Sequence, residues 1–188
     1  MSSIPAGEFS AWLTGMVAAI AGEQDSDVPC GGCTACCRSS QFVHIGPDEV
    51  DTLAHIDPQL LFPAPLMPAG HVVMGYDEHG SCPMLIDDVC SIYEHRPRTC
   101  RTYDCRVFPA AGIEPDDKPL IADRARRWEF DYADSDARSL HDAVRAAARF
   151  VRERDEAPSS ATQLAVLAVE NHASFTERNE LPGGESST

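Results

Sequence analysis

The residues best suited to chemistry are eight cysteines gathered in two short windows. The first window, residues 30–37, reads Cys-Gly-Gly-Cys-Thr-Ala-Cys-Cys, and the second spans residues 82–105. Two consecutive C-x-x-C steps form a short loop whose thiolates can converge on one point, which suits a soft metal ion or an iron–sulfur cluster. The sequence therefore predicts a metal centre with ligands among Cys30, Cys33, Cys36, Cys37, Cys82, Cys90, Cys100 and Cys105.

Two other uses of these cysteines fit the sequence less well. Residues 1–23 show no basic stretch ahead of an apolar one, so we expect no secretory leader and a cytoplasmic location, where disulfides are rare. The adjacent pair Cys36 and Cys37 also makes an awkward disulfide framework. A redox-active C-x-x-C of the thioredoxin kind normally opens a helix after a strand in an α/β pattern, and that pattern is absent.

The choice between iron and zinc depends on ligand spacing. Zinc prefers closed four-cysteine sites, and eight cysteines could hold two such ions. The run 30–36 together with Cys82-Pro83 resembles the arrangement that binds iron–sulfur clusters. Adjacent Cys36 and Cys37 point in different directions, so a cluster or two neighbouring metals accommodate the pair more easily than one zinc ion. The sequence favours a [4Fe–4S]-type cluster, with zinc as the alternative.

Charge narrows the range of partners. The net charge of −15 argues against a general nucleic-acid binder, and no run of 18 apolar residues predicts a membrane span. The cysteine region itself is basic, so its guanidinium groups either offset the charge of metal-bound thiolates or hold an anionic small molecule or protein substrate. The candidates for these roles are Arg38, Arg96, Arg98 and Arg101, with Tyr93 and Tyr103 expected to pack over the metal loops.

The two windows together resemble the CxxCxxCC family, also called YkgJ-like, of zinc- or iron-chelating domains. The resemblance covers roughly residues 30–106 and rests on Cys30-x2-Cys33-x2-Cys36-Cys37-Arg38, Cys82-Pro83-Met84-Leu85 and Cys90-Ser91-Ile92-Tyr93-Glu94-x-Arg96-Pro97-x2-Cys100-Arg101-x-Tyr103. The family includes relatives of flagellin lysine N-methylases, in which a similar motif is described as holding an iron–sulfur cluster. The resemblance implies a metal centre and only weakly a reaction.

Two classes of function therefore stay open, and no catalytic residue is predicted. One is a metal-dependent enzyme that modifies a small molecule or a protein side chain, methyl transfer included. The other is a non-catalytic metalloprotein with structural zinc or with a role in metal storage, delivery or redox sensing. A centre with every position filled by protein would favour the second class.

Amphipathic helices must position the cysteine region. Apolar spacing predicts a helix over residues 8–23 and a helical pair over residues 134–178, begun by Asp134 or Ser135 and, for the second helix, by Ser160 with Gln163. Residues 41–45 and 71–76 read as short strands, and residues 57–70 and 109–119 as proline-rich loops. Acidic residues 48–49 after Pro47 suit a first helical turn, and residues 121–132 give no clear signal.

The expected fold is mostly α with short β elements, in which an irregular metal-organised cysteine core is flanked by amphipathic helices. We expect one domain over residues 1–180 with its metal-binding core at 30–106, and a disordered tail at 181–188. Short helical turns are predicted near Tyr93 and around Cys100.

Overall fold

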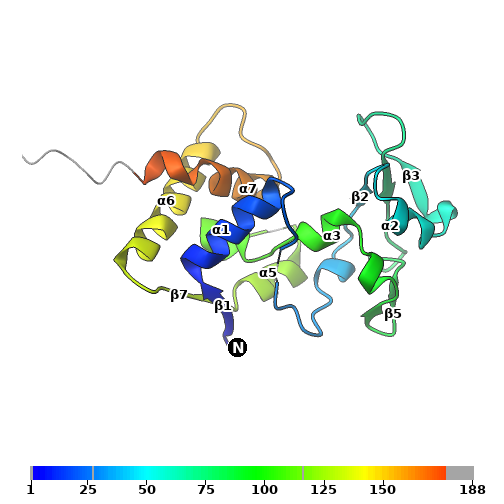
Figure 1. Ribbon diagram of the computed structural model, residues 1–188, viewed down its shortest axis with the longest axis horizontal. Coiled ribbons are helices and arrows are strands. Elements are labelled where there is room, and N and C mark those ends of the chain that lie inside the picture. Colours follow the sequence, from blue (N-terminus) through cyan, green and yellow to red (C-terminus); the bar gives the residue numbers. More distant parts are fainter. Residues whose placement is uncertain (1, 27, 116, 177–188) are drawn as a thin grey trace, which may run out of the picture. The chain divides into compact units, whose positions relative to one another are not determined.

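Helices and small sheets make up the protein, and the computed structural model describes residues 2–26, 28–115 and 117–176 (Figure 1). Helical residues account for 44% of the chain and strands for 13%, which confirms the predicted class of mostly α structure with short β elements. Within the described part, no helix is both long and apolar enough to cross a membrane. The tail at 181–188 lies outside the described residues.

Two compact units divide the chain. The helical unit comprises Met1–Val17, Arg106–Pro115 and Arg127–Thr188, and the cysteine unit comprises Ala18–Cys105 and Asp116–Arg126. All eight cysteines belong to the cysteine unit. The single domain expected over residues 1–180 stays a prediction, and so does the organisation of the core by metal.

Three segments of the chain build the helical unit. Its elements are β1 (Ile4–Glu8), most of α1 (Phe9–Ile20), α4 (Val107–Ala111), β7 (Trp128–Asp131), α6 (Ser135–Arg152), α7 (Ala161–Asn171) and η4 (His172–Phe175). The helix predicted over 8–23 corresponds to α1, and the predicted helical pair corresponds to α6 and α7. These two helices lie side by side, with the fully buried Val144, Ala147 and Val169 among their core residues (Figure 1).

Side-chain caps begin both of these helices. The Asp134 carboxylate accepts a hydrogen bond from the Ala137 N–H at 2.9 Å, and the Ser160 hydroxyl accepts one from the Gln163 N–H at 3.4 Å. Each cap satisfies a backbone N–H that has no partner within its own helix. The N-cap residue of α6, which the sequence left open between Asp134 and Ser135, is therefore Asp134.

A parallel pair of strands joins distant parts of the helical unit. Ile4 of β1 pairs with Trp128 of β7, and the strands run in the same direction. Beside them lies a cluster of rings in which Phe9 packs edge-on to Phe130 at 5.0 Å and stacks on His141 at 4.3 Å. The sequence did not indicate β1, because the five residues Ile-Pro-Ala-Gly-Glu carry no alternating apolar pattern.

The cysteine unit contains a three-stranded antiparallel sheet. Its order is β2 (Val43–Ile45), β4 (Val72–Met74) and β3 (Leu61–Pro63), and β2 and β4 fall where short strands were predicted. The loop predicted over 57–70 is wrong in part, because it contains β3 and the short helical turn η2 (Pro58–Leu60). Pro63 is tolerated because β3 lies at the edge of the sheet and pairs on one side only.

The other elements of the cysteine unit are short. They are η1 (Cys36–Arg38), α2 (Val50–Ala54), the hairpin of β5 (Leu85–Ile86) and β6 (Val89–Cys90), η3 (Tyr93–His95), α3 (Arg98–Thr102) and α5 (Pro119–Ala125). The turns predicted near Tyr93 and Cys100 correspond to η3 and α3. The loop predicted over 109–119 is interrupted by the end of α4 and the start of α5, since proline is tolerated in a first helical turn.

Candidate metal centre

The first cysteine window is a tight loop that ends in a short helical turn. Gly31 has a φ of +56°, a left-handed conformation that glycine adopts without strain, and the Cys33 N–H donates to the Cys30 carbonyl at 3.1 Å. The turn η1 then carries Cys36 and Cys37. From α5, the Arg124 guanidinium reaches the carbonyl of Cys30 at 3.4 Å. Backbone geometry thus brings the four cysteines of the window close together.

The second window meets the first through the backbone. The Cys82 N–H donates to the Cys37 carbonyl at 2.7 Å. The β5–β6 hairpin, whose turn residues both have positive φ, places Cys90 opposite Leu85, while α3 carries Cys100. Cys82, Cys90 and Cys100 all pack against the apolar core of the unit, which consists of Val43, Ile45, Ile56, Met74 and Ile92.

Mutual electrostatics identify one group of four thiols. The pKa of Cys37 is raised to about 11, first by burial and then by the nearby thiols of Cys82 and Cys90. The pKa of Cys100 is raised to about 12, first by burial and then by the thiols of Cys82, Cys37 and Cys90. Cys37 and Cys100 resist ionisation because they lie away from water and because neighbouring thiolates would carry like charge. We call Cys37, Cys82, Cys90 and Cys100 the Cys37 group.

The remaining four thiols gather around Cys36. Burial raises the pKa of Cys36 well above its usual range, and after burial the largest contribution comes from Cys105, followed by Cys30, Cys37 and Cys33. Cys105 is buried and Cys30 is exposed, so this group extends from the interior to the surface. We call Cys30, Cys33, Cys36 and Cys105 the Cys36 group. The adjacent residues Cys36 and Cys37 thus have different principal neighbours.

Backbone donors already surround one of the sulfurs. Burial raises the pKa of Cys82, and the backbone N–H groups of Met84 and Leu85 lower it by hydrogen bonding to the sulfur. Such N–H···S contacts favour the thiolate, which is the form that binds metal. The Cys-Pro-Met-Leu segment therefore prepares the Cys82 sulfur for the charge that a metal ligand carries.

The thiols are more widely spaced than a closed zinc site requires. Four sulfurs at about 2.3 Å from one zinc ion would lie about 3.8 Å from each other. Among the residues that the structure describes, the one trio of potential ligand atoms within 4.8 Å of one another is Asp51, His55 and His95, and it contains no cysteine. In the part of the chain that the structure describes, no three cysteine sulfurs therefore lie within 4.8 Å of one another.

The predicted arginines are engaged by side chains of the cysteine unit. The Arg96 guanidinium lies 3.7 Å from the centre of the Tyr93 ring and donates to the Tyr93 carbonyl at 2.8 Å. The other three pair with carboxylates, namely Arg38 with Asp88, Arg98 with Asp48 at 2.7 Å and Arg101 with Asp25 at 3.1 Å. Tyr103 is half-buried. An anion-binding or charge-compensating role for this set stays a prediction.

One buried carboxylate that holds the site together was not recognised from the sequence. Glu49 accepts hydrogen bonds from the N–H of Gly46 at 2.8 Å and from the N–H of Arg98 at 2.5 Å. It thereby ties the end of β2 to the start of α3, the helix that carries Cys100. An acidic residue after Pro47 is typical of an exposed first helical turn, so no local signal distinguishes this buried role.

Comparison with known families agrees with this chemistry. The CxxCxxCC family, described as a zinc- or iron-chelating domain, matches residues 29–129, which is more than half of the chain. The chain belongs to the CxxCxxCC family. The expected resemblance is thereby confirmed, and the CxxCxxCC match includes all eight cysteines while α6 and α7 lie beyond its end. Neither the curated proteins nor the solved structures give a match.

Proposed function

We propose that this protein holds two neighbouring metal centres, each bound by four cysteines. The observation that carries the proposal is the division of the thiols around the adjacent pair Cys36 and Cys37. One centre takes the Cys36 group and the other takes the Cys37 group. This assignment makes Cys105, and not Cys82, the fourth ligand beside Cys30, Cys33 and Cys36.

We further propose that the centres are [4Fe–4S]-type clusters. The Cys36 group contains the C-x2-C-x2-C run that is typical of cluster ligands. The spacing of the thiols supports the same choice, because no three of the described cysteines approach as closely as a closed zinc tetrahedron would require. Zinc in both sites is the alternative that metal analysis tests.

The proposed role is redox sensing or electron transfer. Four protein thiolates per centre leave no open coordination position for a substrate, which disfavours the metal-dependent enzyme. Ligands on adjacent residues, whose Cα atoms are about 3.8 Å apart, would keep the two centres close enough to exchange electrons. The exposure of Cys30 would give an oxidant in solution access to the centre bound by the Cys36 group.

Metal analysis of protein purified without oxygen tests the proposal. We expect about eight iron atoms and about eight inorganic sulfides per chain. The protein should also show a broad absorption band at about 400 nm that weakens on reduction. About two zinc ions per chain without sulfide would reject the clusters and keep the two centres. About four iron atoms, or one zinc ion, would reject the division into two centres.

A further inference from the structure

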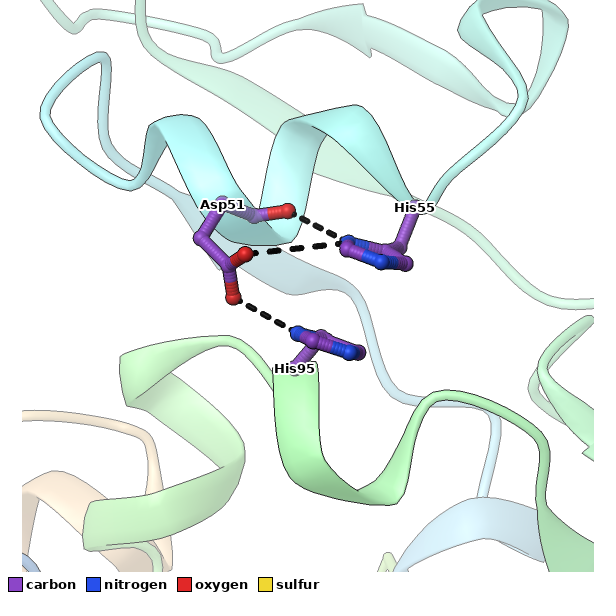
Figure 2. Close-up of side chains that lie close together, drawn as sticks. All are labelled: Asp51, His55 and His95. Carbon is purple, nitrogen blue, oxygen red and sulfur yellow. Dashed lines mark hydrogen bonds and ion pairs between the residues drawn. The ribbon is translucent and has the colours of Figure 1, made fainter.

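A trio of side chains away from the thiol groups has the composition of a metal site. Asp51 lies in α2, His55 is the residue that follows the end of this helix, and His95 is the last residue of η3 (Figure 2). The ligand atoms of the three residues all lie within 4.8 Å of one another. The His95 imidazole contacts the Asp51 carboxylate.

The carboxylate of Asp51 lies between two imidazole nitrogens. His95 Nδ1 is 2.7 Å from Asp51 Oδ2, and His55 Nδ1 is 3.9 Å from Asp51 Oδ1 (Figure 2). The two rings stack with their centres 3.5 Å apart and their planes 6° from parallel. Both Nδ1 atoms are therefore on the side of the rings that faces the carboxylate, so two nitrogens and one oxygen converge.

We propose that Asp51, His55 and His95 bind a divalent transition-metal ion of the Co²⁺, Ni²⁺ or Zn²⁺ class, separately from the cysteine centres. Two imidazoles and one carboxylate suit these ions, whereas thiolates select softer metals and clusters. The ion would take the place of the proton between His95 Nδ1 and the carboxylate. His55 would exchange its present contact with the Asp51 carbonyl, 2.8 Å from Nδ1, for the ion.

The site would be open on its outer side. The side chains are 41% exposed for His55, 37% for His95 and 72% for Asp51. Water would complete the coordination, so the ion would exchange with solvent. Such a site is suited to a metal that is acquired or passed on, in contrast to the half-buried and buried thiols of the Cys37 group and Cys105.

Cobalt binding to the intact, metal-loaded protein tests this inference. We expect equilibrium dialysis to give one Co²⁺ per chain beyond the metal present on purification. No thiolate-to-cobalt charge-transfer band should appear, because the ligands are nitrogen and oxygen. His55→Gln, His95→Gln and Asp51→Asn should each weaken this binding about tenfold or more. His79→Gln is the matched control, since His79 is exposed beside Glu78 and lies outside the trio.

Three results would overturn the inference. They are the absence of an extra Co²⁺ ion, unchanged affinity in both histidine variants, and a charge-transfer band showing that the added cobalt binds thiolates. Histidine NMR of the unmodified protein keeps the test independent of how the variants fold. Added Zn²⁺ should shift the imidazole signals of His55 and His95 and leave those of His79 in place, and the absence of such shifts would also refute the site.

Discussion

Two adjacent cysteines are central to the proposed division of the thiols between two metal centres. The side chains of Cys36 and Cys37 have different principal thiol neighbours, although only one peptide bond separates the residues. The sequence predicted all eight cysteines as ligands and anticipated that this pair would point in different directions. It did not reveal that Cys105 is the principal thiol neighbour of Cys36, because that proximity depends on how a distant segment folds back.

Single cysteine substitutions should therefore remove one centre at a time. Cys100→Ser should lose the centre of the Cys37 group, and Cys105→Ser should lose the centre of the Cys36 group. Each variant should keep about half of the iron and sulfide of the unmodified protein, since each cluster holds four iron atoms. Iron and sulfide analysis of anaerobic protein checks this. Loss of all metal in both variants would contradict two separable centres.

A second residue-scale prediction concerns the turn that leads into Cys82. The Asp77 carboxylate accepts hydrogen bonds from the N–H of Ser81 at 2.8 Å and of His79 at 2.9 Å. The hydrogen bond from Ser81 is the largest influence and lowers the pKa of Asp77 below its ordinary value of 3.8. Because the pKa of Asp77 is lower in the folded protein, its carboxylate stabilises the turn at pH values above the ordinary pKa. This stabilisation is lost as the pH falls through the pKa of the folded protein.

We expect the Ser81 amide to lose protection from hydrogen exchange, relative to its intrinsic rate, as the pH falls below about 3.8. In Asp77→Ala the protection at pH 6 should already be low, and acid should reduce it no further. Amide exchange measured by NMR from about pH 6 to about pH 3 follows both proteins. Equal protection of Ser81 in the two proteins at pH 6 would show that the carboxylate does not hold the turn.

At the scale of elements, the long helices and the strands β2 and β4 were predictable, and the other short strands were not. Residues 135–152 and 161–171 carry helical apolar spacing, each stretch directly follows a capping residue, and α6 and α7 form there. β3, β5 and β6 are two or three residues long, so their strand conformation depends on partners and turns and not on an alternating pattern. The parallel pairing of β1 with β7 has no local signature at all.

The cap of α6 gives a prediction with a built-in control. Asp134→Ala should destabilise the protein by about 1 kcal/mol, because the Ala137 N–H loses its acceptor. Ser135→Ala, one residue further on, should change stability by less than about 0.5 kcal/mol, since Ser135 is exposed and is not the capping residue. Chemical denaturation of the unmodified protein and both variants gives the free energies of unfolding to be compared. Equal losses would show that the two residues share the cap.

At the scale of the whole molecule, the helical unit depends on its last helix. Ala165, Ala168 and Val169 of α7 are fully buried, and α7 packs on both α6 and α4. Removing residues 158–179 would expose the apolar faces of these two helices to water. We expect the deletion to abolish the cooperative thermal transition of the helical unit, monitored by near-ultraviolet circular dichroism of its aromatic cluster.

The cysteine unit provides the comparison for that deletion. Its sheet and its cysteines come from residues before the deleted segment. If the two units fold together as the single domain expected from the sequence, the deletion should also lower metal content. If metal content is kept while the aromatic signal is lost, the units fold separately and the single-domain prediction is wrong. An unchanged thermal transition would contradict the role assigned to α7.

The pairing of β1 with β7 also has a consequence for the order of events during synthesis. Ile4 and its partner Trp128 are about 120 residues apart in the sequence. Because a ribosome adds roughly 5–20 residues per second, β1 is made about 6–25 seconds before the strand with which it pairs. All eight cysteines emerge during that interval. If the cysteines bind metal as proposed, the nascent chain can acquire it before β1 has its partner strand, and the supply of metal at the ribosome would then influence how much protein matures.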